Sequence, residues 1–239
     1  MLRKYPIVPG TIHHVYSRGA AKLPICKEEA DYWRFMQGLC LFNDVASTSS
    51  ILWRIERDRR RLTMNVLKEY VVQQSHKREP LVRVLAYCAM GNHYHLLLEE
   101  IRKGGITQFM RKLGTGYARY FNNKHDRVGV LFQSRFKNIL VEDERYLQYL
   151  LVYINVLNPI GIAEPSWKEK GIRNIDEALA FAERYRFSSH LDYLGKRGSL
   201  ILDKGILAEL LSTPDAYVEL VKGVLKEKKY RAIEHLTLE

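Results

Sequence analysis

The sequence predicts an α+β fold built on an antiparallel sheet. Up to residue 160, segments with the periodicity of strands and helices follow one another in the order β-α-(α)-β-β-α-β-α. The two central strands, residues 81–90 and 93–100, are joined only by a short Gly-Asn turn, so we expect them to pair antiparallel. Beyond Gly161 the pattern changes to loops and helices. This order is typical of a ferredoxin-like (RRM-like) sandwich followed by a C-terminal helical extension.

The first predicted strand and helix occupy residues 11–19 and 27–42. The strand is rich in β-branched and aromatic residues and is closed by a glycine. The helix carries apolar side chains at helical spacing, namely Tyr32, Phe35, Met36, Leu39 and Phe42. After a polar break, a long and basic helical pattern covers residues 51–74. Its charge run, residues 57–61, is either a solvated helix face or a phosphate contact.

Two helices and one strand complete the predicted domain. A helix over residues 106–121 follows a pair of glycines, and residues 130–141 are predicted to be extended. The last helix opens with three acidic residues, 142–144, which suit the positive end of the helix dipole. We expect it to end near Asn158, since Pro159 disfavours a helical conformation in the residue before it. Residues 1–160 are therefore assigned to one domain and residues 161–239 to a helical tail.

The charge of the chain indicates the class of its partner. The 239 residues carry a formal net charge of +11, which favours a polyanion, either nucleic acid or an acidic membrane surface. No apolar run approaches the roughly 18 residues of a membrane span, and the N-terminus lacks the apolar core of a signal peptide. We therefore expect a cytoplasmic protein that binds nucleic acid and no membrane. The three widely spaced cysteines predict neither a disulfide framework nor a zinc ribbon.

One motif at the head of the third predicted strand carries candidate chemistry. In His93-Tyr94-His95 the two histidines are two residues apart, so on a strand both imidazoles point to the same face. Two imidazoles with open positions suit a catalytic divalent ion such as Mg²⁺ or Mn²⁺, which would polarise a phosphate oxygen. The alternative is a half-exposed sheet face without a metal.

A nucleophile has to be found elsewhere in the chain. The sequence contains neither a Gly-x-Ser-x-Gly motif nor a Walker-type loop. Tyrosine is abundant, with 15 residues, and several precede Pro159 on the last predicted helix of the domain. A tyrosine that attacks a phosphodiester forms a phosphotyrosine ester and preserves the energy of the broken bond. Because the pKa of a phenol is ordinarily about 10, a neighbouring cation would have to activate it at neutral pH.

The same residues resemble a known family. Residues 90–98 are similar to the HUH motif (His, bulky residue, His) of single-tyrosine transposases, the insertion-sequence-200-like family and its REP-associated relatives. Further stretches resemble the family's other strands and helices, in the same order along most of the chain: residues 14–19, 109–122, 129–137, 146–159 and 185–190. The resemblance implies metal-dependent cleavage and rejoining of single-stranded or hairpin DNA through a 5′-phosphotyrosine. In it, Tyr153 matches the nucleophile, with Tyr146 and Tyr149 as competitors, and His93 and His95 match the metal ligands.

The sequence departs from the family pattern at two places. The family's third metal ligand is a polar side chain one turn after the tyrosine, but position i+4 here is Leu157, and Asn158 stands at i+5. On an ideal helix Asn158 would point about 140° away from Tyr153. A π-bulge would restore the register and make Asn158 the third ligand; otherwise that ligand is water or another group. The second departure is a helical insertion of the domain at about residues 44–79.

Contacts to DNA are assigned to basic residues. The candidates for phosphate binding are Arg18, Arg111, Arg119, Arg135 and Lys137. Tyr117 and Tyr120 either stack on unpaired bases or pack in the core. His14 is either part of the site or a hydrogen-bonded histidine of the sheet.

Two other functions are compatible with the sequence. One is a non-catalytic nucleic-acid-binding protein on the same fold, and the other is an RRM-like RNA-binding protein. Whether the chain acts as a monomer or a homodimer is left open.

Overall fold

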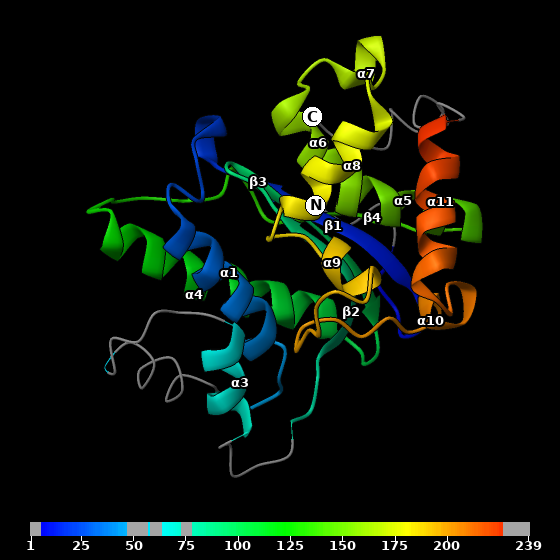
Figure 1. The fold of residues 1–239 in the computed structure, drawn as a ribbon. Coiled ribbons are helices and arrows are strands. Elements are labelled where there is room, and N and C mark those ends of the chain that lie inside the picture. Colours follow the sequence, from blue (N-terminus) through cyan, green and yellow to red (C-terminus); the bar gives the residue numbers. More distant parts are fainter. Residues whose placement is uncertain (1–5, 47–56, 58–63, 73–77, 227–239) are drawn as a thin grey trace.

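The computed structural model describes residues 6–46, 57, 64–72 and 78–226. Four strands form one antiparallel sheet in the order β2-β3-β1-β4 (Figure 1). They are β1 (Ile12–Arg18), β2 (Val82–Ala89), β3 (His93–Glu100) and β4 (Lys137–Leu140). β3 pairs antiparallel with both of its neighbours, β2 and β1. The predicted α+β, ferredoxin-like fold is confirmed by this strand order.

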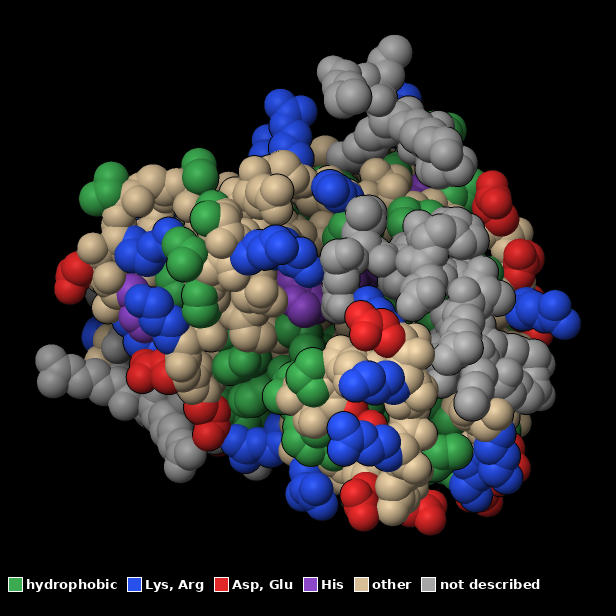
Figure 2. Space-filling model, turned by 90° about the horizontal axis from the view of Figure 1, so that it is seen from above, with side chains coloured by type: hydrophobic (Ala, Val, Ile, Leu, Met, Phe, Trp, Pro, Cys, Tyr) green, Lys and Arg blue, Asp and Glu red, His purple; other side chains and the backbone are tan. Residues whose placement is uncertain are grey.

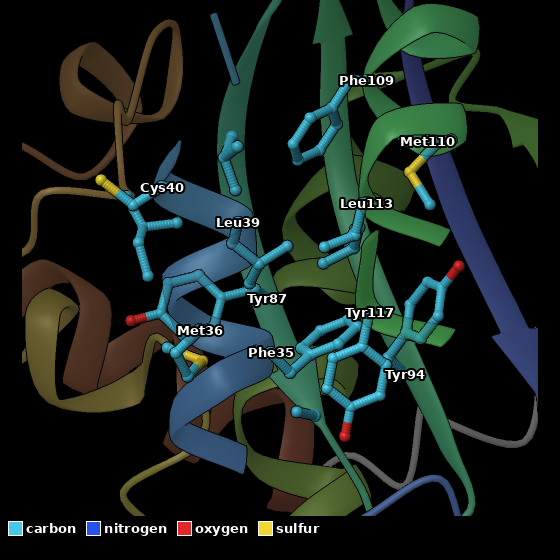
Figure 3. Packing of buried hydrophobic residues seen from close by; sticks show 14 of the residues in the cluster. Phe35, Met36, Leu39, Cys40, Tyr87, Tyr94, Phe109, Met110, Leu113 and Tyr117 are labelled. Carbon is cyan, nitrogen blue, oxygen red and sulfur yellow. The ribbon is translucent and has the colours of Figure 1, made fainter. Parts of the chain in front are cut away.

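One face of the sheet is covered by α1 (Glu29–Leu41) and α4 (Gly105–Lys124). Apolar side chains of the sheet and of both helices form a continuous core there. Phe35 of α1 packs against two tyrosines that are labelled beside it in Figure 3. Its ring centroid lies 5.0 Å from that of Tyr94 of β3 and 5.2 Å from that of Tyr117 of α4. Tyr117 is buried and donates its hydroxyl to the Ile25 carbonyl oxygen at 2.6 Å, so the core interpretation of this tyrosine is confirmed.

The opposite face is covered by one long helical stretch and by the C-terminal helices. The stretch consists of α5 (Glu144–Val152), the π-helix η2 (Tyr153–Leu157) and α6 (Asn158–Ala163). Further along the chain α8 (Ile175–Arg184) and α11 (Pro214–Lys226) pack against it (Figure 1). Shorter helices complete this layer: α7 (Trp167–Lys170), α9 (His190–Tyr193) and α10 (Leu207–Leu210). Residues beyond 160 therefore share a core with the sheet, while their assignment to a separate unit stays a prediction.

The expected end of the last domain helix near Asn158 is wrong. The helical path continues through Pro159, which lies in the first turn of α6. A proline is tolerated there because one wide turn precedes it: the amide of Asn158 bonds to the carbonyl of Tyr153, five residues back. Residues 130–141 were predicted to be extended, and within this range the strand β4 is confirmed. Before β4, residue 132 makes one isolated β-bridge, to Gly19.

The prediction that no apolar run approaches the length of a membrane span is wrong, because α5, η2 and α6 form one continuous helical stretch. Glu144–Ala163 is a helical stretch of 20 residues with a mean hydropathy of 1.2 in its most apolar window, which satisfies the length and composition of a span. That window is 78% buried inside the protein. This is the environment of a core helix, which passes the same test.

The predicted insertion is described in part. Within it α3 (Met64–Val72) is helical, as predicted for residues 51–74, and packs against α1. Apart from Arg57, the basic run of residues 57–61 lies outside the described residues. The three cysteines are free and buried. The sequence predicted no disulfide framework for them.

Acid is expected to destabilise the C-terminal layer through His190. Burial lowers the pKa of this histidine to about 4, while Glu183 raises it and Lys196 lowers it. The unfolded chain, with a histidine pKa of 6.5, then binds the proton more readily than the folded chain, so stability falls as the pH drops from 6.5 towards 4. Between pH 7 and 5 this costs about 2 kcal/mol of unfolding free energy.

Urea unfolding at both pH values measures that loss. In His190→Gln the decrease between pH 7 and 5 is expected to be smaller than in the wild type by about that amount. Equal decreases in the two proteins would assign the acid sensitivity to other groups.

Candidate active site

The histidine pair lies on the sheet face that carries the long helical stretch. His95 is directly opposite Tyr16, and His93 is directly opposite Arg18, across the β1–β3 ladder. Residues directly opposite in a ladder share a face, so these four side chains form two adjacent rows. The rings of His93 and His95 have centroids 5.1 Å apart. Tyr94, between them, points into the other core, as the strand periodicity predicts.

The side chain of Tyr153 lies next to this histidine pair. Its ring meets the His95 ring edge-on, with centroids 5.4 Å apart, and the His14 ring at 6.2 Å. Tyr149, one turn earlier, stacks on Tyr153 with centroids 6.3 Å apart. Tyr153 is fully buried, with an exposed fraction of 0%. The structure therefore brings Tyr153 next to the histidines, while its access to solvent is closed in this conformation.

His14 is a hydrogen-bonded partner of the histidine pair. Its Nε2 lies 2.8 Å from Nδ1 of His95, and both side chains are buried. Burial lowers the pKa of His14 to about 3. Burial, and then the proximity of His14 and His93, lowers the pKa of His95 well below its ordinary value. Both imidazoles are thus neutral at neutral pH, and a single hydrogen atom is shared across their contact.

The position of that hydrogen decides what His95 can bind. Nε2 of His95 is buried and has no hydrogen-bond partner among the described residues. When Nδ1 of His95 donates to Nε2 of His14, the lone pair on Nε2 of His95 is available to a metal ion. A histidine ligand commonly has its second nitrogen fixed by such a hydrogen bond. His14 therefore fits the role of the residue that orients His95.

Asn92 fixes the tautomer of His93 in a similar way. Its amide nitrogen donates to the Lys22 carbonyl oxygen at 3.3 Å, which turns its Oδ1 towards His93. Nδ1 of His93 lies 2.6 Å from that oxygen and must donate to it. Nε2 of His93 consequently carries a lone pair. The two histidines therefore suit the same kind of metal contact, through Nε2.

The donor set for a metal is limited to these groups. Among residues 6–46, 57, 64–72 and 78–226, no three His, Cys, Asp or Glu side chains form a cluster that could hold a metal ion. Two neutral imidazoles with open positions still fit a divalent ion that is completed by an amide oxygen, water or phosphate. Asn158 is buried, and its Nδ2 has no hydrogen-bond partner within the described part of the chain. The conditional expectation of a π-bulge before Asn158 is confirmed, whereas its role as third ligand stays a prediction.

A cavity of about 210 Å³ opens beside the histidines. Its lining comes from β1, the turn after β1, β3, the loop before β4 and the first residue of β4: Tyr16, Ser17, Arg18, Lys22, His93, Tyr94, His95, Gln133, Ser134 and Lys137. The lining is basic and contains no Asp or Glu. On the face seen in Figure 2, histidine side chains are recessed between Lys and Arg side chains. Tyr153 does not contribute to this lining.

The predicted phosphate-binding residues separate into two groups. Arg18 and Lys137 line the cavity, whereas the nearby Arg135 is exposed outside it. Arg111 and Arg119 are exposed on α4, which covers the opposite face of the sheet. The structure therefore does not bring these two arginines to the histidine pair. Any contact that they make with DNA remains a prediction for a surface apart from the cavity.

Five cavity residues were not predicted as site residues from the sequence: Tyr16, Ser17, Lys22, Gln133 and Ser134. Lys22 sits in a tight turn with a positive φ of 62°, and its place beside His93 depends on how that turn folds over Asn92. Gln133 and Ser134 immediately precede Arg135, so their position in the chain was the only sequence signal. The amide of Gln133 bonds to the Arg18 carbonyl, which ties this loop to β1.

Comparison with known proteins finds a family model that matches part of the chain. Residues 48–156 match the family model described as "Transposase IS200 like". The matched residues contain β2, β3, α4, β4 and α5, and with them His93, His95 and Tyr153. Over this segment, which is less than half of the chain, the protein is similar to IS200-like transposases. The matched segment thus includes the histidine pair and the tyrosine that the fold brings together.

Similarity to curated proteins and to solved structures is more limited. No curated protein matches the chain. A solved structure described as a REP-associated tyrosine transposase bound to a REP hairpin is similar with a TM-score of 0.43 and 12% sequence identity. The similarity covers 85% of this chain and 93% of that chain. β1, with His14 and Arg18, and the residues after 156, with Asn158, lie outside the matched segment.

Proposed function

We propose that this protein is a transposase of the IS200-like kind, a metal-dependent endonuclease of single-stranded or hairpin DNA that cleaves and rejoins strands through a 5′-phosphotyrosine. One observation carries the proposal: the Tyr153 ring lies edge-on to His95, 5.4 Å away between centroids, while His93 and His95 line a basic cavity. A tyrosine, a pair of neutral imidazoles and cationic side chains are the groups that phosphodiester transfer by a phenol requires.

The residues of the site have separate roles in the proposed reaction. Nε2 of His93 and Nε2 of His95 would hold a divalent ion, Mg²⁺ or Mn²⁺, with Asn158 as the candidate third ligand. Such an ion, when bound, polarises the phosphate oxygen and offsets the charge of the phenolate. His14 and Asn92 orient the two imidazoles. Arg18, Lys22 and Lys137 bind the DNA backbone along the cavity.

The transfer itself is a substitution at phosphorus. The Tyr153 oxygen attacks, the bond from phosphorus to the 3′ oxygen breaks, and the phenolic proton ends on the released 3′-hydroxyl. The 5′ phosphate stays on Tyr153, and attack by a 3′-hydroxyl reverses the reaction. Because Tyr153 is buried behind His95, its helix or the residues that cover it must move before the phosphate can reach it.

Removal of metal tests the proposal on the whole chain. Hairpin-forming and unstructured single-stranded oligonucleotides are incubated with the protein in Mn²⁺, in Mg²⁺ or in chelator, and the products are separated under denaturing conditions. We expect a covalent protein–DNA adduct with metal and none with chelator, and no adduct with fully paired duplex. Failure to form an adduct with any single-stranded DNA in Mn²⁺ would overturn the proposal.

Complete burial of Tyr153 favours a second candidate, a nucleic-acid-binding protein of the same family that has lost cleavage. Such a protein would bind through the basic cavity and would need no metal. Its binding would persist in chelator and in His93→Ala, and no adduct would form. Competition between DNA and RNA oligonucleotides separates it from the RRM-like RNA-binding alternative. Cytoplasmic location and the choice between monomer and homodimer stay predictions.

A further inference from the structure

The turn that carries Tyr153 has an unusual backbone requirement. Pro159 has no N–H, so the carbonyl of Asn155, four residues earlier, cannot receive the usual hydrogen bond of an α-helix. The ring of Pro159 would also clash with that carbonyl in a regular helix. The π-helix η2 widens the turn, but a buried carbonyl still needs a donor. Asn155 is itself fully buried, two residues after Tyr153.

The C-terminal extension satisfies this turn with side chains. The Ser188 hydroxyl donates to the Asn155 carbonyl at 3.3 Å, and the Ser189 hydroxyl donates to Asn155 Oδ1 at 2.5 Å. Asn155 Nδ2 in turn donates to the Tyr217 hydroxyl of α11 at 3.3 Å. His190 Nδ1 lies 2.8 Å from the same hydroxyl. All five side chains are buried, so these bonds are not exchanged with solvent.

The same serines are attached to the sheet beside the histidine pair. Ser188 forms a bridge with Cys88 of β2, and Cys88 is directly opposite His95 in the β2–β3 ladder. The amide of Ser189 bonds to the Tyr87 carbonyl at 2.9 Å, and the amide of Tyr87 bonds to the Ser189 hydroxyl at 3.1 Å. One short segment therefore contacts both the strand next to His95 and the turn that holds Tyr153.

We propose that Ser188, Ser189 and Tyr217 form a positioning clamp on Asn155, which fixes the π-turn and thereby sets where Tyr153 stands relative to His93 and His95. The clamp residues touch neither DNA nor metal, and they act through Asn155. This inference rests on the proposed function in that Tyr153 is taken as the nucleophile. Misplacement of a reacting group by about 1 Å can cost on the order of 10²-fold in rate, so loss of a clamp bond should affect the transfer step.

Ser188→Ala and Tyr217→Phe test the clamp from two different elements. With saturating single-stranded DNA and Mn²⁺, each is expected to lower the rate of adduct formation by about 10- to 100-fold, while DNA affinity stays at the wild-type value. Tyr193→Phe is the matched control, because Tyr193 is a buried tyrosine of the same core whose hydroxyl bonds to the Leu85 carbonyl at 2.7 Å and not to Asn155. It should form adduct at the wild-type rate. An equal loss in Tyr193→Phe, or no loss in both clamp variants, would overturn the inference.

Hydrogen exchange provides a measurement that does not depend on catalysis. The amides of Leu157 and Asn158 should exchange at least about 10-fold faster in Ser188→Ala and Tyr217→Phe than in the wild type and in Tyr193→Phe. If the wild type forms no adduct but this difference is found, the proposed function fails and the clamp on the turn stands. Unchanged exchange in both clamp variants would overturn the clamp whatever the activity. Tyr217→Phe leaves the strand-paired serines intact, so it stays informative if Ser188→Ala does not fold.

Discussion

Tyr153→Phe is expected to abolish covalent attachment of DNA, a loss on the order of 10³-fold or more, because it removes the only oxygen that the proposed transfer places on phosphorus. The ring would keep its contacts with His14, His95 and Tyr149, so the fold should be retained. Binding of single-stranded DNA should remain, since the phenol does not line the basic cavity. Adduct formation under denaturing separation, with binding measured in parallel, gives both quantities.

Tyr149→Phe is the control for that substitution. Its ring stacks on Tyr153 in the same helical stretch, one turn earlier, with centroids 6.3 Å apart. It should retain adduct formation within a few-fold of the wild type. An adduct of equal yield in Tyr153→Phe would assign the nucleophile to another residue, and its loss in Tyr149→Phe alone would make Tyr149 the nucleophile.

The second large effect is expected at the histidine pair. His93→Ala removes one of the two Nε2 donors, and adduct formation should fall by at least about 10²-fold at any attainable Mn²⁺ concentration. His93 is half-buried, so its removal disturbs the core less than removal of the fully buried His95. DNA binding in chelator should be unchanged. A rate that still depends on metal with the wild-type midpoint would contradict the assignment of His93.

His14→Gln distinguishes an orienting role from a direct one. Loss of a residue that orients a metal ligand typically lowers metal affinity by about 10- to 100-fold without abolishing activity. We therefore expect a shift of the Mn²⁺ midpoint by this factor, with near wild-type rates at saturation. Complete loss at saturating metal, in a folded protein, would mean that His14 itself acts at the phosphate.

Several features of the fold follow from local patterns in the sequence. The Gly-Asn turn between two apolar runs predicts the β2–β3 hairpin, and the spacing of His93 and His95 predicts their common face. Apolar spacing predicts α1. The end of the long helical stretch could not be predicted this way. The proline rule considers one residue and its neighbours, whereas here a π-turn widens the helix before Pro159, and the hydroxyl of Ser188, 33 residues from Asn155, donates to the Asn155 carbonyl.

The sequence by itself determined the order of the elements, the orientation of the histidine pair and the basic character of the chain, because periodicity and charge are local properties. The tertiary structure decided which groups meet at the site. The contact of His14 with His95 joins residues 81 positions apart and depends on the β1–β3 register. The distance from Tyr153 to His95 depends on how the helical stretch crosses the sheet. The placement of Arg111 and Arg119 on the other face follows from which side α4 packs against. None of these can be read from a local pattern, since each is fixed by packing between segments that are far apart in the chain.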